Sequence, residues 1–67
     1  MLTRALVTNG YGINALLPEG VGEQFQDNDY CTVLGFLGME DEVVIVAPRS
    51  GLVFTITYDE HSLSIEQ

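Results

Sequence analysis

The sequence predicts an all-β domain, folded as a small five-stranded barrel or sandwich. Short apolar segments rich in β-branched residues recur along the chain, and Gly, Pro, Asn and Asp residues separate them. No segment shows the sustained i, i+3, i+4 spacing of an amphipathic helix. Short, regularly spaced strands with turn signals between them are typical of small barrels and sandwiches.

The first half of the chain is expected to begin with a hairpin. Residues 2–8 are apolar and β-prone, and Asn9-Gly10 is a strong signal for a tight hairpin turn. The returning strand is expected at residues 13–17, where Pro18 ends it and starts a loop.

The second half predicts three more strands, at residues 30–36, 42–47 and 52–58. The strand at 42–47 is apolar on both faces and is therefore expected to be central. The tail, residues 59–67, fits one short turn of helix or an edge strand. The side chains expected in the core are Leu34, Val44, Ile45 and Val53.

Size suggests that the domain needs a partner. The chain has 67 residues, which are expected to form a single domain over 1–67, and a domain this small buries little apolar surface. Cys31 is the only cysteine and His61 the only histidine, so neither a disulfide nor a zinc site is expected. A homodimer is the remaining way to stabilise so small a core.

Charge is the most informative bulk property. The chain has ten carboxylate side chains and two basic residues, Arg4 and Arg49, which gives a net charge of −8. Nucleic-acid binders take much of their affinity from Lys and Arg at phosphates, so the composition disfavours them and favours a basic protein partner. The alternative is that acidity only maintains solubility.

The location is expected to be the cytoplasm. An unpaired cysteine and the lack of a long apolar segment at the N-terminus favour it. No apolar run reaches the ~18 residues of a membrane span, so no membrane association is expected.

Residues 10–15 match the glycine pattern G-x-G-x-x-A of dinucleotide-binding turns. The residues that follow do not have the pattern of a helix, and 67 residues are too few for the full nucleotide-binding domain. The segment is therefore interpreted as a glycine-rich hairpin turn, and no cofactor is expected.

Asp27-Asn28-Asp29 begins like a calcium loop. The glycine and glutamate that such a loop requires at its sixth and twelfth positions are replaced by Thr32 and Gly38. We interpret the cluster as a solvated turn, and no metal site is expected.

Asp59, Glu60 and His61, with Ser62 and Ser64 nearby, contain the residue types of a hydrolytic triad. Adjacent residues point in different directions, and so small a domain has little room for a substrate pocket. No catalytic residue or small-molecule substrate is expected.

Aromatic side chains divide into core and surface candidates. Phe36 and Phe54 are expected in the core, whereas Tyr11 and Tyr58 are candidates for exposed anchors. Cys31 is expected to be a small buried hydrophobic residue.

From residue 22 onward the chain resembles the carbon storage regulator (CsrA/RsmA) family of small dimeric RNA-binding translational regulators. Met1-Leu2-Thr3-Arg4 is similar to a shortened form of the family's opening strand. Several further segments follow in the family's order: Gly22-Glu23, Asp27, Thr32-Val33-Leu34-Gly35 within the third strand with Gly38 in its turn, and residues 43–48 with their Ala-Pro ending. The resemblance implies five strands per chain in a strand-exchanged homodimer.

The chain departs from that family where the family reads RNA. Only Arg4 remains of the basic residues on the first strand, since Ala5 stands where a second arginine is usual. The last strand offers Thr55, Ile56 and Tyr58 where an arginine is expected. The resemblance therefore implies the scaffold with a largely lost, degenerate RNA-binding surface.

Two functions follow as hypotheses, both non-catalytic, and a structural or assembly protein with no separable activity is the third alternative. In the first, the chain acts in translational regulation and binds RNA weakly through Arg4 and Arg49. In the second, it is a small acidic inhibitor of the phage or mobile-element type that mimics nucleic acid and binds a basic host protein. The candidate residues for that contact are Glu40, Asp41, Glu42, Asp59 and Glu60. Acids gathered on one face favour the second hypothesis; scattered acids with clustered arginines favour the first.

Overall fold

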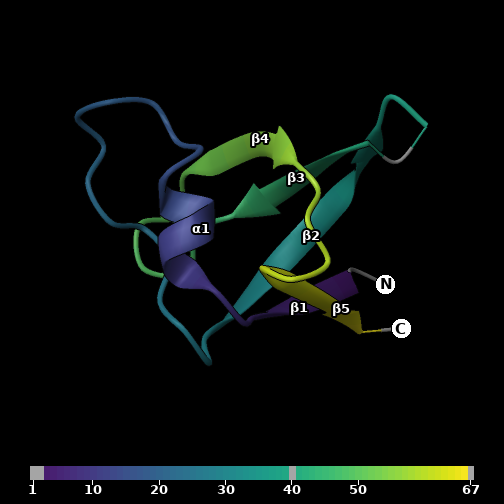
Figure 1. Ribbon diagram of the computed structural model, residues 1–67, viewed down its shortest axis with the longest axis horizontal. Coiled ribbons are helices and arrows are strands. Elements are labelled where there is room, and N and C mark those ends of the chain that lie inside the picture. The colour runs from purple at the N-terminus through teal and green to yellow at the C-terminus, as the bar shows by residue number, and fades with distance from the viewer. Residues whose placement is uncertain (1–2, 40, 67) are drawn as a thin grey trace.

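The chain folds as a five-stranded antiparallel sheet with one short helix (Figure 1). The computed structural model describes residues 3–39 and 41–66. The elements in chain order are β1 (Thr3–Val7), α1 (Gly10–Asn14), β2 (Tyr30–Leu37), β3 (Glu42–Val46), β4 (Val53–Thr57) and β5 (Leu63–Glu66). This confirms the all-β class.

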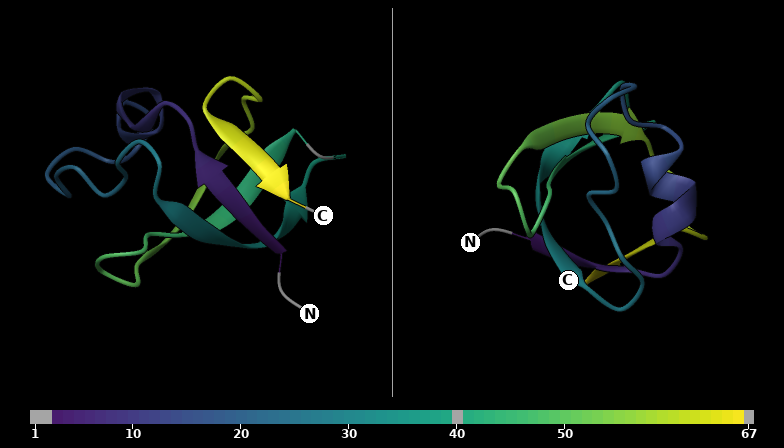
Figure 2. Two further views of the ribbon diagram at one scale, coloured as in Figure 1. Left: turned by 90° about the horizontal axis from the view of Figure 1, so that it is seen from below. Right: turned by 90° about the vertical axis from the view of Figure 1, so that its left-hand side faces the viewer.

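The strands lie in the order β4-β3-β2-β1-β5, so β4 and β5 are the two edges. The sheet curls strongly without closing, and α1 lies on the open side between the edge strands (Figure 2, right). Every strand pairing forms within the one chain. Exchange of strands with a second chain stays a prediction. Among the described residues, no helix has the length and apolar character needed to cross a membrane.

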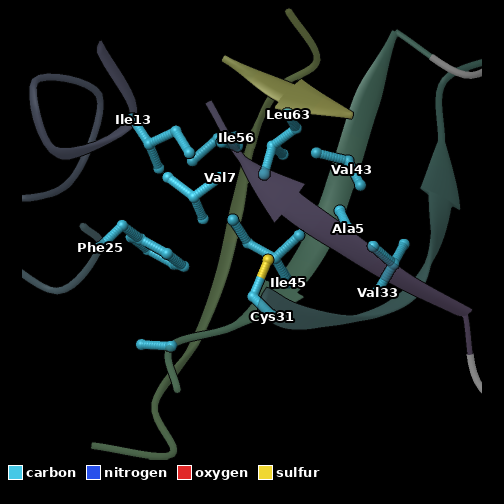
Figure 3. Close-up of a cluster of buried hydrophobic side chains, with 11 residues drawn as sticks. Ala5, Val7, Ile13, Phe25, Cys31, Val33, Val43, Ile45, Ile56 and Leu63 are labelled. Carbon is cyan, nitrogen blue, oxygen red and sulfur yellow. The ribbon is translucent and has the colours of Figure 1, made fainter. Parts of the chain in front are cut away.

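The core fills the concave side of the curled sheet (Figure 3). Alternate residues of each strand point inward, as the two-residue period of a strand requires. Ile13 of α1 and Phe25 of the following segment close the open side of this cluster. The buried side chains are Ala5, Val7, Ile13, Phe25, Cys31, Val33, Val43, Ile45, Ala47, Ile56 and Leu63.

Part of the expected core lies on the convex face instead. Ile45 is fully buried, but Leu34 is 48% exposed, Val53 is 56% exposed, and Val44 is half-buried. A bulge between Val33 and Gly35 shifts the register of β2, which leaves Leu34 without a partner on β3. The expectation was therefore wrong for Leu34 and Val53. Leu34 alternates with the buried Val33, and Val53 pairs with Val46 on the convex face.

Residues 9–17 do not form the expected hairpin. They form α1 and a turn, and Asn9 caps the helix by accepting a hydrogen bond from the Gly12 N–H at 3.1 Å. Burial of Ile13 under the sheet outweighs the local turn preference of Asn-Gly. The fifth strand is instead β5, so the edge-strand alternative for the tail is confirmed.

Asn14 binds α1 to the segment that leads into β2. The Asn14 amide donates to the Phe25 carbonyl at 2.8 Å, and its oxygen accepts from the N–H groups of Gln24 and Phe25 at 3.0 Å. These bonds hold Phe25 over the core, where its ring meets Phe54 edge to face at 6.2 Å.

Replacing Ile45 with Ala should lower the free energy of unfolding by about 2–5 kcal/mol, because it leaves a cavity in the core. Leu34→Ala, on the convex face, should cost less than about 1 kcal/mol. Urea denaturation followed by circular dichroism measures both. Equal losses would contradict the assignment of Leu34 to the convex face.

Candidate functional site

Two of the candidate carboxylates lie at one end of the sheet, and two more lie in the loop that leaves the same end. Asp41 precedes β3 and Glu42 begins it, and Asp59 and Glu60 follow β4. Because β3 and β4 are antiparallel, Glu42 lies opposite Thr57, and the Tyr58 N–H donates to the Asp41 carbonyl at 2.9 Å. We call Asp41, Glu42, Asp59 and Glu60 the acidic end. Glu40 lies outside the described residues.

The carboxylates of the acidic end differ in the hydrogen bonds and ion pairs that they already make. Asp59 accepts hydrogen bonds from the His61 N–H at 2.9 Å and from the Ser62 hydroxyl at 3.2 Å, so it shapes the turn before β5. Glu60 is exposed, with Oε1 3.9 Å from His61 Nε2. Asp41 and Glu42 are exposed and have no basic partner among residues 3–39 and 41–66. Three carboxylates are therefore available to a partner.

Apolar side chains lie beside the acidic end. Leu37 ends β2 and is 51% exposed, and Met39, in the turn that follows, is 97% exposed. Phe36 was expected in the core but is partly exposed, and its ring meets Tyr58 edge to face at 6.0 Å. Sequence reasoning missed Leu37 and Met39; the available signal was a large apolar residue inside a turn.

The other aromatic candidates are divided between surface and core. Tyr11 is 82% exposed on α1, as expected of a surface anchor, but Tyr58 is half-buried. Phe54 is partly buried and packs against the core.

The two arginines are each held by a separate carboxylate. Arg4 on β1 donates from Nε to Glu66 on β5 at 2.9 Å, and its guanidinium lies 4.1 Å from the centre of the Tyr30 ring. Arg49, in the turn before β4, donates to Asp29 at 2.9 Å and to Gln26 at 2.9 Å. The arginines thus join different pairs of segments and do not form one basic cluster.

The ion pair with Arg4 affects the pKa of Glu66. The hydrogen bond from Arg4, with a second from the Tyr30 hydroxyl, lowers the pKa of Glu66 below its usual value. Among residues 3–39 and 41–66, Cys31 has no such partner to lower its pKa, and burial raises the pKa of its thiol to about 11. Cys31 is therefore a buried hydrophobic residue, as expected, and a poor nucleophile near neutral pH.

The glycine pattern of residues 10–15 serves close packing. A Cβ at Gly10 would lie 2.8 Å from the Phe25 carbonyl oxygen, and one at Gly12 would lie 2.9 Å from Ser62 Oγ. The segment opens a helix of five residues. Both glycines are thus needed where α1 meets its neighbours.

Residues 27–29 form the expected turn, with Asn28 at a φ of 72°. Asp27 accepts from the Gly10 N–H at 2.6 Å, and Asp29 binds Arg49. Within the described part of the chain, no group of His, Cys, Asp and Glu side chains is arranged to hold a metal ion.

Comparison with known proteins finds no match: neither a protein-family model, nor a curated protein, nor a solved structure corresponds to this chain. The resemblance to the carbon storage regulators therefore stays a prediction. Function has to be inferred from the charges, exposed side chains and strand edges described above.

The titration of Glu66 tests the Arg4 ion pair. Because the folded-state pKa is lowered, this pair contributes stability above the unfolded pKa, and the contribution is lost as pH falls through the folded pKa. Arg4→Ala should raise the Glu66 midpoint measured by carboxyl NMR, whereas Arg49→Ala should leave it unchanged. An unchanged midpoint in Arg4→Ala would refute the pair.

Proposed function

We propose that this chain is a non-catalytic regulatory binding protein whose acidic end holds a basic protein partner. The supporting observation is that Leu37 pairs with Glu42, so the exposed side chains of Leu37 and Met39 lie in the same hairpin as Asp41 and Glu42. Protein interfaces commonly combine an apolar centre with a polar rim. Carboxylates accelerate association with a positively charged partner, and the apolar side chains add surface that leaves water on binding.

The acidic end is well placed for such a contact. The β2–β3 hairpin projects at one end of the molecule, away from the loop between α1 and β2 (Figures 1 and 2). The net charge of −8 repels nucleic acid and attracts surfaces rich in Lys and Arg. A basic groove that normally binds nucleic acid fits this description, with carboxylates in place of phosphates. The protein then acts as an acidic inhibitor.

RNA binding in translational control, as in the carbon storage regulators, is the second candidate function. The observation in its favour is the exposed Arg4 guanidinium stacked on the Tyr30 ring, since such a pair can stack on an unpaired base. RNA would have to compete with Glu66 for Arg4 and with Asp29 for Arg49. These ion pairs make RNA binding the weaker of the two proposals.

The acidic end should bind a short peptide of alternating Arg and Leu at low ionic strength. NMR titration should shift the amide signals of residues 37–42 and 58–60. Glu42→Gln combined with Glu60→Gln should weaken binding about tenfold, because two exposed charge contacts are lost.

The matched control is Glu19→Gln combined with Glu23→Gln. These exposed glutamates lie in the loop between α1 and β2, and the control removes the same charge from the other end of the molecule. Its affinity should change by less than about twofold, as expected for distant, screened charges. Equal weakening in both double variants would show that net charge alone attracts the peptide, and would overturn a localised site.

RNA binding is tested by a gel shift with a hairpin that carries a GGA loop, the element that the carbon storage regulators recognise. A shift at low salt that Arg4→Ala abolishes would support the second candidate. Absence of a shift at high micromolar protein would exclude it and leave the basic partner as the function to pursue.

A further inference from the structure

We propose that two copies of this chain pair edge to edge through β4, antiparallel, with Thr55 of one copy opposite Thr55 of the other. The two sheets then form one continuous sheet. The pairing depends on the backbone and side chains of β4 and is independent of any partner at the acidic end.

The outer edge of β4 is unpaired. The Leu52 carbonyl accepts from the Ala47 N–H at 2.8 Å, and the Tyr58 N–H donates to the Asp41 carbonyl at 2.9 Å, so the even-numbered residues of this strand face β3. Antiparallel geometry turns the N–H and C=O groups of the intervening residues the other way. Within residues 3–39 and 41–66, no backbone or side-chain bond outside the β3–β4 ladder reaches Val53, Thr55 or Thr57.

Features that normally protect a sheet edge are lacking on β4. Residues 52–58 include no charged residue and no proline, and β4 pairs with β3 without a bulge. Natural edge strands use these devices to prevent pairing with another chain. Val53 also leaves more than half of its surface exposed. This edge therefore has the properties of a pairing surface.

The opposite edge is less suited to pairing. β5 has four residues, and the Leu63 N–H already donates to the Asp59 carbonyl at 3.1 Å. Glu66 at its end carries charge and binds Arg4. Pairing is accordingly expected at β4.

The sequence of β4 favours a second copy as the occupant. A two-fold axis at Thr55 places Val53 opposite Thr57 of the second copy, and each facing pair exchanges both N–H···O bonds. These β-branched side chains lie on the convex face, level with Val44 and Val46 of β3. Cross-strand pairs of β-branched residues and of threonines stabilise antiparallel sheets.

The absence of charge on β4 also matters for pairing. Two chains of net charge −8 repel at long range, but Val53–Thr57 carries no charged side chain, so no like charges face each other along the paired strands.

Cysteine cross-linking tests both the pairing and its register. In a hydrogen-bonded antiparallel pair the Cα atoms lie about 5.5 Å apart, within the range of a disulfide. Thr55→Cys, treated with oxidised glutathione under native conditions, should give a covalent dimer on a non-reducing gel. The wild-type chain is the negative control and should give no covalent dimer, since its cysteine, Cys31, is buried.

The matched control is Thr57→Cys. In the proposed register its counterpart on the second copy lies about 13 Å away, four residues along the strand, which is too far for a disulfide. The proposal is supported if Thr55→Cys forms the covalent dimer at least about tenfold faster than Thr57→Cys does. Equal rates, or no covalent dimer from Thr55→Cys, overturn it.

Sedimentation equilibrium gives a second readout. The wild-type chain should be dimeric at millimolar concentration. Thr55→Lys should weaken the dimer at least about tenfold, because like charges then face each other, whereas Ser64→Lys on the exposed face of β5 should not. A wild-type monomer at every concentration refutes the pairing. A dimer that persists in Thr55→Lys refutes it too and points to strand exchange.

Discussion

The fold depends on covering the concave face of a sheet that does not close on itself. Five short strands curl around apolar side chains, and the gap between the edge strands exposes that core unless another segment fills it. Ile13 and Phe25 fill it, and the hydrogen bonds of Asn14 keep their two segments together. The glycines of α1 permit the close approach that this cover requires. A motif that resembles a phosphate-binding turn thus has a packing role.

The antiparallel register of β3 and β4 determines both surfaces proposed for binding. Because Glu42 lies opposite Thr57, the loop that carries Asp59 and Glu60 starts at the same end of the sheet as Asp41 and Glu42. Because β4 ends the sheet, the same register turns the polar groups of Val53, Thr55 and Thr57 outward. One surface is charged and the other is neutral, so they suit different occupants and can be occupied together.

The sequence predicted the parts of the structure whose patterns are local. β2, β3 and β4 match the expected strands to within one residue at each end, since turn residues flank each of them. The helix at Gly10–Asn14 was missed because burial of Ile13, a tertiary effect, decides against the hairpin signal of Asn9-Gly10. Leu34 is exposed because it alternates with the buried Cys31 and Val33, and the sequence of β2 does not show which of its faces is buried. Adjacent acids were visible from the sequence, but the placement of Leu37 opposite Glu42 required the register.

The placement of the two arginines connects stability with partner choice. Arg4 neutralises Glu66 where β1 meets β5, and Arg49 neutralises Asp29 where the turn before β4 meets the segment before β2. Both bases therefore offset internal carboxylates, and the remaining acids determine the field around the molecule. A phosphate must displace a carboxylate to reach either guanidinium, whereas a lysine or arginine of a partner reaches Asp41 or Glu42 without displacing a described basic residue. Because RNA must displace an internal carboxylate and a basic protein need not displace any described basic residue, this comparison favours a basic protein as the proposed partner.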